Sequence, residues 1–153
     1  MGNEWKIELA NFFEELRILE ASKQETLKDF NDFCEFVVEP AFENLEDELS
    51  QYEIASKIIK VQGRSIAFQI NFSKSRISQF KYIIVLPQGS LKMRLKLTLR
   101  GRKTKKSEAK EATQDFMEGI DPFQMLDLDK EQVIQDIIEK YRDFIFKSIA
   151  AVE

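Results

Sequence analysis

Apolar residues recur at helical spacing through the first fifty positions. They form two stripes: Leu9, Phe12, Phe13, Leu16 and Leu19, then Leu27, Phe30, Cys34, Val37, Ala41, Leu45 and Leu49. Ser22 followed by Glu25 three residues later is typical of a helix start, so we expect a second helix to begin there. Pro40 lies inside the second stripe, where it removes a backbone hydrogen bond, and we expect a kink or a new helix there.

After Ser50 the period changes from helical to alternating. Four runs rich in β-forming residues are separated by polar turns, two of which contain Gln62–Gly63 and Gln88–Gly89. Strict alternation places these residues on one side of the second and fourth runs: Ile66, Phe68, Ile70 and Phe72, then Leu91, Met93, Leu95, Leu97 and Leu99. Such alternation predicts a sheet with one covered face and one wet face.

The remaining segments complete a single predicted domain over residues 1–153. Residues 101–113 have few apolar side chains and are expected to form a mobile linker. A last amphipathic helix is expected from Lys130 to about Ala150, capped by Asp129 with Gln132. The prediction is an α+β fold: a four-stranded antiparallel meander (52–100), two or three amino-terminal helices (1–50) and a helical carboxy-terminal segment (114–153) whose long helix packs on one face.

The apolar band on the last helix is broader than the stripe that covers one core. A helix of this kind has apolar side chains left over after its own sheet is covered. We therefore expect a homodimer that uses Ile138, Tyr141 or Ile145.

Charge is strongly segregated along the chain, although the net charge is only -4. Residues 1–56 carry a net charge of -11, residues 57–107 carry +14 with no acid at all, and residues 108–153 carry -7. The predicted sheet is therefore a basic slab between acidic helices.

The basic residues are densest between positions 91 and 106. The residues expected to bind an anion are Lys92, Arg94, Lys96, Arg100, Arg102, Lys103, Lys105 and Lys106. Spaced at alternate strand positions, they are placed to follow a nucleic-acid backbone. Three alternatives stay open: lysines that protect an edge strand, charge pairing with the acidic helices, and an acidic protein or membrane surface as partner.

Residue types argue against an enzyme. Histidine is absent, which removes the commonest general base at neutral pH and most zinc sites. The second to fourth predicted strands carry no acid that could hold a catalytic metal, and no phosphate-cradling glycine motif is present. Asp121, Asp127 and Asp129 are better explained as helix caps. Cys34, the single cysteine, lies in an apolar run and is expected to be a small buried residue, so no cofactor or metal is expected.

The hydropathy and charge of the sequence also lead to expectations about location and function. No run of about 18 apolar residues is long enough to span a membrane, and the acidic amphipathic start resembles no targeting signal, so a cytoplasmic protein is expected. The leading hypothesis is a non-catalytic binding or adaptor module that docks the basic margin of its sheet onto an anionic partner, above all nucleic acid. The alternative is a small acidic chaperone or assembly partner that binds other polypeptides.

Overall fold

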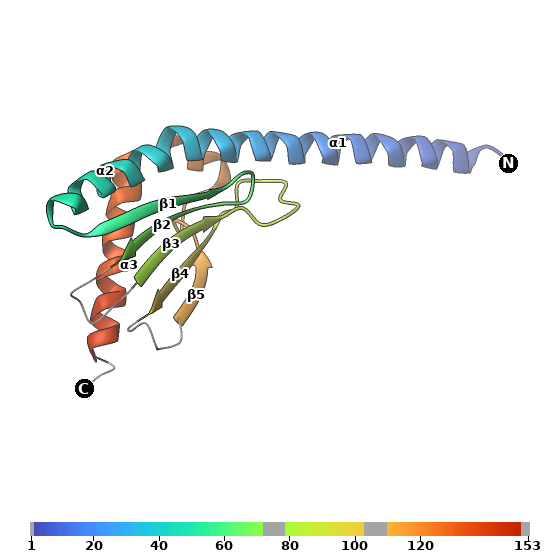
Figure 1. The fold of residues 1–153 in the computed structure, drawn as a ribbon. Helices are drawn as coiled ribbons and strands as arrows, with labels where there is room; N and C mark the ends of the chain where they lie inside the picture. Colours follow the sequence, from blue (N-terminus) through green and yellow to red (C-terminus); the bar gives the residue numbers. More distant parts are fainter. Residues whose placement is uncertain (1, 72–78, 103–109, 151–153) are drawn as a thin grey trace.

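Ten elements make up the described part of the chain, which in the computed structural model is residues 2–71, 79–102 and 110–150, with side chains described up to residue 147. In chain order they are α1 (Glu4–Phe33), a π-helical turn (Cys34–Val38), α2 (Glu39–Gln51), β1 (Ala55–Val61), β2 (Ser65–Asn71), β3 (Gln79–Val85), β4 (Lys96–Arg102), β5 (Lys110–Asp115), a 3-10 helix (Pro122–Asp127) and α3 (Lys130–Ala150). Figure 1 shows an antiparallel sheet flanked by helices, which confirms the α+β class.

The first fifty residues form one long helical run. The predicted helix start at Ser22 is wrong, because the Ser22 carbonyl accepts a hydrogen bond from the Thr26 hydroxyl (2.9 Å) in the middle of α1. No glycine or proline lies between residues 3 and 39, so the backbone contains no residue that would break the helix. Among the described helices, none is both long enough and apolar enough to cross a bilayer.

Pro40 is accommodated by the π-helical turn that precedes it. The backbone N–H of Glu39 donates to the carbonyl oxygen of Cys34, five residues back instead of four. This wider turn makes room for the ring of Pro40, which would clash with the preceding turn of a regular α-helix. α2 begins at Glu39, with Pro40 in its first turn. The backbone stays helical through this point, so the kink or new helix expected at Pro40 is present only as a change of helix type between Val38 and Glu39.

The sheet has five strands in the order β1-β2-β3-β4-β5, and all neighbouring pairs are antiparallel. The predicted turn at Gln62–Gly63 joins β1 to β2, and Gly63 has a φ of 72°, which glycine adopts without strain. Ile66, Phe68 and Ile70 of β2 are buried against the helices, as the alternation predicted, and Phe72 of the same predicted set lies outside the described residues.

A fifth strand replaces part of the expected linker and of the expected carboxy-terminal helical segment. β5 pairs with β4 from Lys96 opposite Asp115 to Gly101 opposite Lys110. Its sequence, KEATQD, shows no alternation of apolar and polar residues, and most of its side chains are exposed. Backbone pairing with β4 therefore decides that this segment is a strand. Residues 103–109 of the predicted linker lie outside the described residues.

β4 begins later than the predicted fourth strand, which included residues 90–95. The N–H of Arg94 donates to the carbonyl of Lys92 (2.8 Å), a tight turn that ends extended pairing on this side. Met93 and Leu95 are nevertheless buried, as the alternation predicted, whereas Leu91, predicted on the same side, is 44% exposed.

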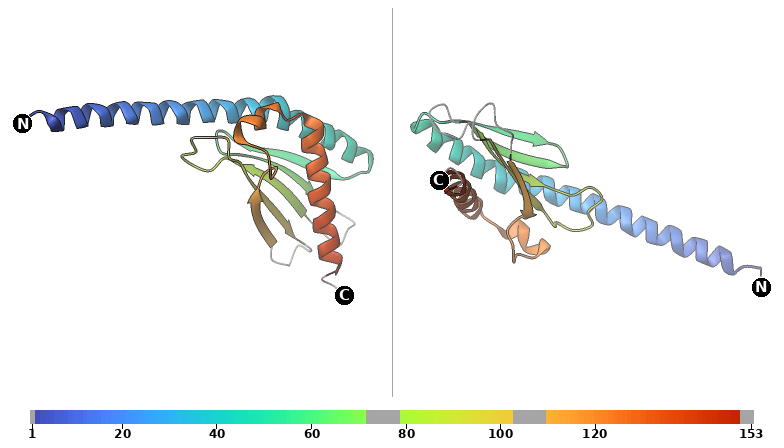
Figure 2. Two further views of the ribbon diagram at one scale, coloured as in Figure 1. Left: turned by 180° about the vertical axis from the view of Figure 1, so that it is seen from behind. Right: turned by 90° about the horizontal axis from the view of Figure 1, so that it is seen from below.

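The helices lie on one side of the sheet, and the other side is open (Figures 1 and 2). Phe42 of α2 packs on Phe68 and Tyr82, with ring centroids 5.2 and 6.4 Å away. α3 runs at a steep angle to α1 and packs on β3 and β4, where Tyr141 and Phe144 both contact the ring of Phe80. The core between these layers is almost wholly apolar.

Candidate functional site

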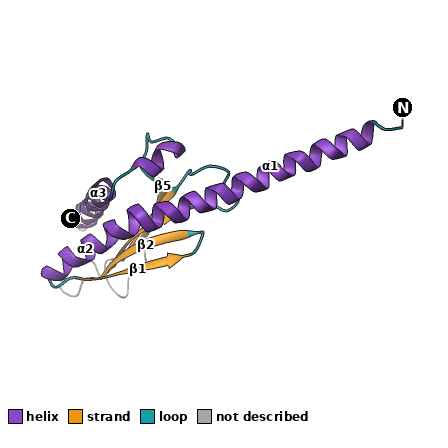
Figure 3. Cartoon of the chain, turned by 90° about the horizontal axis from the view of Figure 1, so that it is seen from above, coloured by secondary structure: helices purple, strands orange, loops and turns teal. Residues whose placement is uncertain are grey.

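The amino-terminal half of α1 projects away from the rest of the molecule (Figures 1 and 3). Every residue from position 4 to position 21, which we call the arm, is exposed, whereas the described residues from Ser22 onward form the body. The arm nevertheless carries eight large apolar side chains: Trp5, Ile7, Leu9, Phe12, Phe13, Leu16, Ile18 and Leu19. Trp5 is 59% exposed and Phe12 is 52% exposed.

Most of these side chains lie on one stripe that continues into the buried face of α1. Positions 5, 9, 12, 16, 19 and 23 follow steps of four and three residues, which keeps them on one side of a helix. The same steps continue to Thr26, Phe30 and Phe33, which are buried against the body. The arm therefore extends the core-facing surface of α1 beyond the end of the core.

A pocket of about 450 Å³ lies where the arm joins the body. Its walls come from Ser22–Asp29 of α1, from residues 91–94 before β4, and from the 3-10 helix region of residues 121–126. The apolar lining includes the exposed side chains of Leu91, Phe123 and Leu126. Lys92 and Arg94 supply positive charge to the pocket, and Glu25, Asp29 and Asp121 supply negative charge. This root pocket borders the side of α1 that bears the stripe, since Thr26 belongs to both.

The open face of the sheet carries a row of cations that crosses four strands. Strand register places Lys57 of β1, Lys81 of β3 and Arg100 of β4 in one row, and the uncharged, buried Gln69 of β2 lies between Lys57 and Lys81. Lys57 and Arg100 are exposed and Lys81 is half-buried. The next rows are partly apolar; they contain Ile59, Ala67, Ile83 and Thr98, then Val61, Ser65, Val85 and Lys96. None of the described strands places an aromatic side chain on this face, so it offers no platform for base stacking.

The eight predicted anion-binding residues do not form one stripe. Lys92 and Arg94 are exposed in the loop before β4, Lys96 and Arg100 are exposed on β4, and Arg102 is half-buried at its end. Lys96 forms an ion pair with Asp115, and Arg100 stands opposite Glu111 in the register. Lys103, Lys105 and Lys106 lie outside the described residues. The prediction overlooked Lys57 and Lys81, which only strand pairing brings beside Arg100, and the two acids of β5.

The three residues expected at a dimer interface on α3 differ in their surroundings. Tyr141 is half-buried and packs on Phe80, with ring centroids 5.6 Å apart, and Ile145 is also half-buried. Ile138 is exposed. A dimer through these residues stays a prediction, although part of the apolar excess on α3 is used within the chain.

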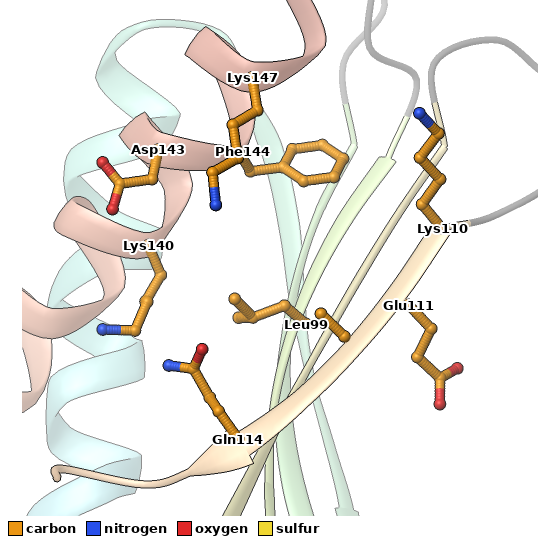
Figure 4. Close-up of a pocket in the computed structure, with 9 residues that line it drawn as sticks. Leu99, Lys110, Glu111, Gln114, Lys140, Asp143, Phe144 and Lys147 are labelled. Carbon is orange, nitrogen blue, oxygen red and sulfur yellow. The ribbon is translucent and has the colours of Figure 1, made fainter.

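A groove of about 420 Å³ separates α3 from the β5 edge of the sheet (Figure 4). Leu99 and the ring of Phe144 give it an apolar floor, and Lys110, Lys140 and Lys147 stand around it. Lys140 is paired with Asp136 of α3 at 3.1 Å. β5 is an edge strand, and its charged side chains at this groove discourage pairing with a further strand.

Two groups with raised pKa values, Cys34 and Tyr82, are part of the core. Burial raises the pKa of the Cys34 thiol to about 12, so the thiol is protonated at neutral pH and is a poor nucleophile. Burial raises the pKa of Tyr82 well above its usual value, and the Asp136 carboxylate, which accepts a hydrogen bond from the Tyr82 hydroxyl, raises it further. These groups stabilise the packing and do not line a cavity.

The acidic residues near α3 act mainly as caps. Asp121 caps the 3-10 helix together with Gln124, and Asp129 caps α3 with Gln132 through bonds of 2.9 and 3.0 Å. The capping interpretation is confirmed for these two residues. Within the ranges that the structure describes, no group of three or more cysteine, aspartate or glutamate side chains could hold a metal ion.

The distinctive surfaces of this protein are thus the apolar arm, the root pocket beside it and the cationic row on the open sheet face. Each has a geometry suited to binding, and the arm exposes the most apolar surface. Comparison of the chain with protein-family models, with curated proteins and with solved structures finds no match.

Proposed function

We propose that this protein is a non-catalytic assembly module that binds another polypeptide through its arm. The observation that carries the proposal is the apolar stripe of the arm, whose side chains are all exposed in the single chain. Large contiguous apolar surfaces on monomers mark interaction sites because their exposure to water is unfavourable.

The pattern of the arm favours a helical partner. Apolar residues at steps of four and three form a narrow seam that fits a groove or a second helix. Five acids and two bases accompany the seam in residues 4–21, so charge can select the partner and its orientation. All residues of the arm are exposed, so tertiary packing does not stabilise this part of α1, and partner binding would supply such packing.

Site-specific photocross-linking in the native host tests this proposal. A benzophenone amino acid at Phe12 should form polypeptide adducts on irradiation, because this side chain lies in the middle of the seam. The matched control carries the same group at Tyr52, which is 69% exposed but lies at the other end of the helical run. Leu9→Glu should suppress the Phe12 adducts. Absence of adducts at Phe12, or equal adducts at Tyr52, would contradict the proposal.

A second candidate function is binding of an anionic partner, nucleic acid above all, on the open sheet face. The supporting observation is the row formed by Lys57, Lys81 and Arg100. Neighbouring strands lie about 4.8 Å apart, so these cations span roughly 14 Å, enough to contact several phosphates of one backbone. Sequence-specific recognition is not expected, since backbone contacts carry none.

The salt dependence of binding to labelled duplex DNA and RNA tests the second candidate. Replacing Lys57, Lys81 and Arg100 with Gln should reduce the slope of log K against log salt by about 0.9 for each phosphate contact that is lost. Gln at Lys92 and Arg94, which lie off this face, is the control and should preserve the slope. No binding by the wild type at about 50 mM salt would exclude this candidate.

A further inference from the structure

We propose, building on the assembly function above, that the partner of the arm is the arm of a second copy of this chain. The two arms run antiparallel, and Trp5 of each copy is seated in the root pocket of the other copy. Three independent features of the molecule support this arrangement: the spacing of the seam, the charges beside it and the position of the root pocket.

The seam is self-complementary when two arms are antiparallel. In such a pair, each residue at one seam position faces the alternate seam position of the other helix. The facing pairs are Trp5 with Lys23, Leu9 with Leu19, and Phe12 with Leu16, each occurring twice. The overlap covers residues 5–23, about 27 Å at 1.5 Å per residue, and therefore uses the whole arm. In the single chain the Lys6 amine lies 5.5 Å from the centroid of the Trp5 ring; in the pair, Lys23 of the other copy offers this ring a further cation at each end.

The charges beside the seam favour the antiparallel orientation over the parallel one. In the antiparallel pair, Lys6 of each copy lies beside Glu20 of the other, and the two Phe13 rings meet. The unfavourable contact of this arrangement is between the two Glu15 side chains. Parallel pairing would place Lys23 against Lys23 within the seam and Glu15 beside Glu20 on both flanks. Like charges at these positions destabilise a coiled coil and select against that orientation.

The root pocket lies where the antiparallel pairing brings the other copy's Trp5. Trp5 faces Lys23, and the pocket is built on α1 from Ser22 to Asp29. Its volume of about 450 Å³ is large enough for an indole ring. The exposed ring of Phe123 lines it. Lys92 and Arg94 can pair with Glu4 and Glu8 of the incoming arm, whereas Glu25, Asp29 and Asp121 of the pocket oppose these acids, so apolar contact supplies the main attraction for Trp5. These two cations of the predicted basic stripe thus acquire a specific role.

Light scattering on the purified full-length chain tests self-association. The wild type should have twice the mass of one chain at about 100 μM. Leu16→Glu, in the seam, should give a monomer, whereas Ile18→Glu, also at an exposed position but on the opposite side of α1, should remain a dimer. A monomeric wild type overturns the inference. A dimer that persists in Leu16→Glu also overturns it and points to another interface, such as α3.

Cysteine pairing tests the orientation. Phe12→Cys and Leu16→Cys chains, mixed and oxidised, should form a disulfide-linked mixed dimer, because these positions face each other in the antiparallel pair. Each variant alone should not cross-link to itself; self-cross-linking of either one indicates a parallel pair and overturns the proposal. The native Cys34 is fully buried and does not interfere.

Fluorescence of the single tryptophan tests the seat of Trp5. Trp5 emission should shift to longer wavelength on dilution as the indole leaves the pocket. Phe123→Ser should produce a similar red shift at high concentration, while Phe146→Ser, at an exposed position on α3, should produce none. Trp5 emission that does not respond to Phe123→Ser overturns the assignment of this pocket.

The outcomes also separate this inference from the function on which it rests. A monomer in solution whose Phe12 position still forms adducts in the host would overturn the self-pairing and leave the assembly function standing. A monomer without such adducts would overturn both.

Discussion

Gly101 shows how a single residue can decide the position of a helix. It is buried in β4 directly beneath Phe144 of α3, and a methyl group at position 101 would lie 1.8 Å from the Cζ atom of that ring. The missing side chain is therefore what allows the ring to reach Phe80, 5.2 Å away between centroids. The polar residues around Gly101 in the sequence give no sign of this role.

We expect Gly101→Ala to lower the free energy of unfolding by about 1–3 kcal/mol, the usual cost of overpacking. Denaturant unfolding of this variant, of Phe144→Ala and of the double variant forms a complete cycle. The double variant should be more stable than the sum of the single effects predicts, because removing the ring removes the clash. If the two single effects on the free energy of unfolding simply add in the double variant, a side chain at position 101 does not clash with the ring of Phe144.

Cys34 gives the molecule a pH dependence at the alkaline end. Burial raises the pKa of its thiol from 9.0 to about 12, partly offset by Lys60 and reinforced by Glu39. Below pH 9 both the folded and the unfolded chain hold the proton, so the full stability is present. Between pH 9 and about 12 only the unfolded chain ionises, and stability should fall by about 1.4 kcal/mol per pH unit.

Denaturant unfolding across pH 8–11 can isolate this contribution. Cys34→Ala should show a shallower loss of stability than the wild type above pH 9, whatever its stability at pH 8. At pH 8 the native thiol should also react with a thiol reagent far more slowly than the unfolded chain does. Parallel pH profiles for the two proteins would be inconsistent with a thiol pKa near 12.

At the scale of elements, α3 is held to the sheet by one buried polar contact as well as by its apolar face. The Tyr82 hydroxyl of β3 donates to the Asp136 carboxylate, which also pairs with Lys140 at 3.1 Å. This contact gives α3 a defined register along the sheet, because an apolar face alone can slide. The rings of Tyr141 and Phe144 then complete the packing one and two turns later.

Tyr82→Phe should lower the free energy of unfolding at pH 7 by about 1.5–3 kcal/mol, since it removes a hydrogen bond to a charged acceptor. The pKa of Tyr82 is raised in the folded chain, mainly by burial, so this residue loses its stabilising effect as pH rises above 10. The difference in stability between wild type and variant should therefore shrink above pH 10. A difference in unfolding free energy between wild type and Tyr82→Phe that grows above pH 10 would show that the pKa of Tyr82 is not raised by folding.

At the scale of the whole molecule, the arm and the body depend on different interactions. All described residues from position 2 to position 21 are exposed, and the first buried residue of α1 is Thr26. The body therefore contains a complete core of its own. Only the assembly that we propose gives the arm a buried surface.

Deleting residues 2–20 should leave the body folded. Its unfolding free energy, measured at low micromolar concentration, should change by about 1 kcal/mol or less, as for surface changes in general. Extending the deletion to residue 33 should cause a much larger loss, because it removes Phe30 and Phe33 from the core. Near-ultraviolet circular dichroism and the dispersion of NMR chemical shifts report whether the shortened chains keep fixed tertiary structure. If the chain that lacks residues 2–20 has no fixed tertiary structure, the division into arm and body is wrong.

The sequence by itself determined the local features of this protein. Period and alternation identify most of the inward residues of β2 and β4, Asp129 with Gln132 identifies the start of α3, and Gly63 identifies a turn. These features are predictable because each depends on side chains a few residues apart in one element. The burial of Cys34 could also be predicted from the apolar run around it.

The tertiary structure alone decided which surfaces are available for binding. β5 is a strand because β4 offers its free edge, and its own sequence carries no strand pattern. Lys57, Lys81 and Arg100 form a row because of strand register, although 43 residues separate the first from the last. The stripe of the arm is visible in the sequence, yet its exposure is not, because helical spacing is the same whether a stripe covers its own sheet or projects beyond it.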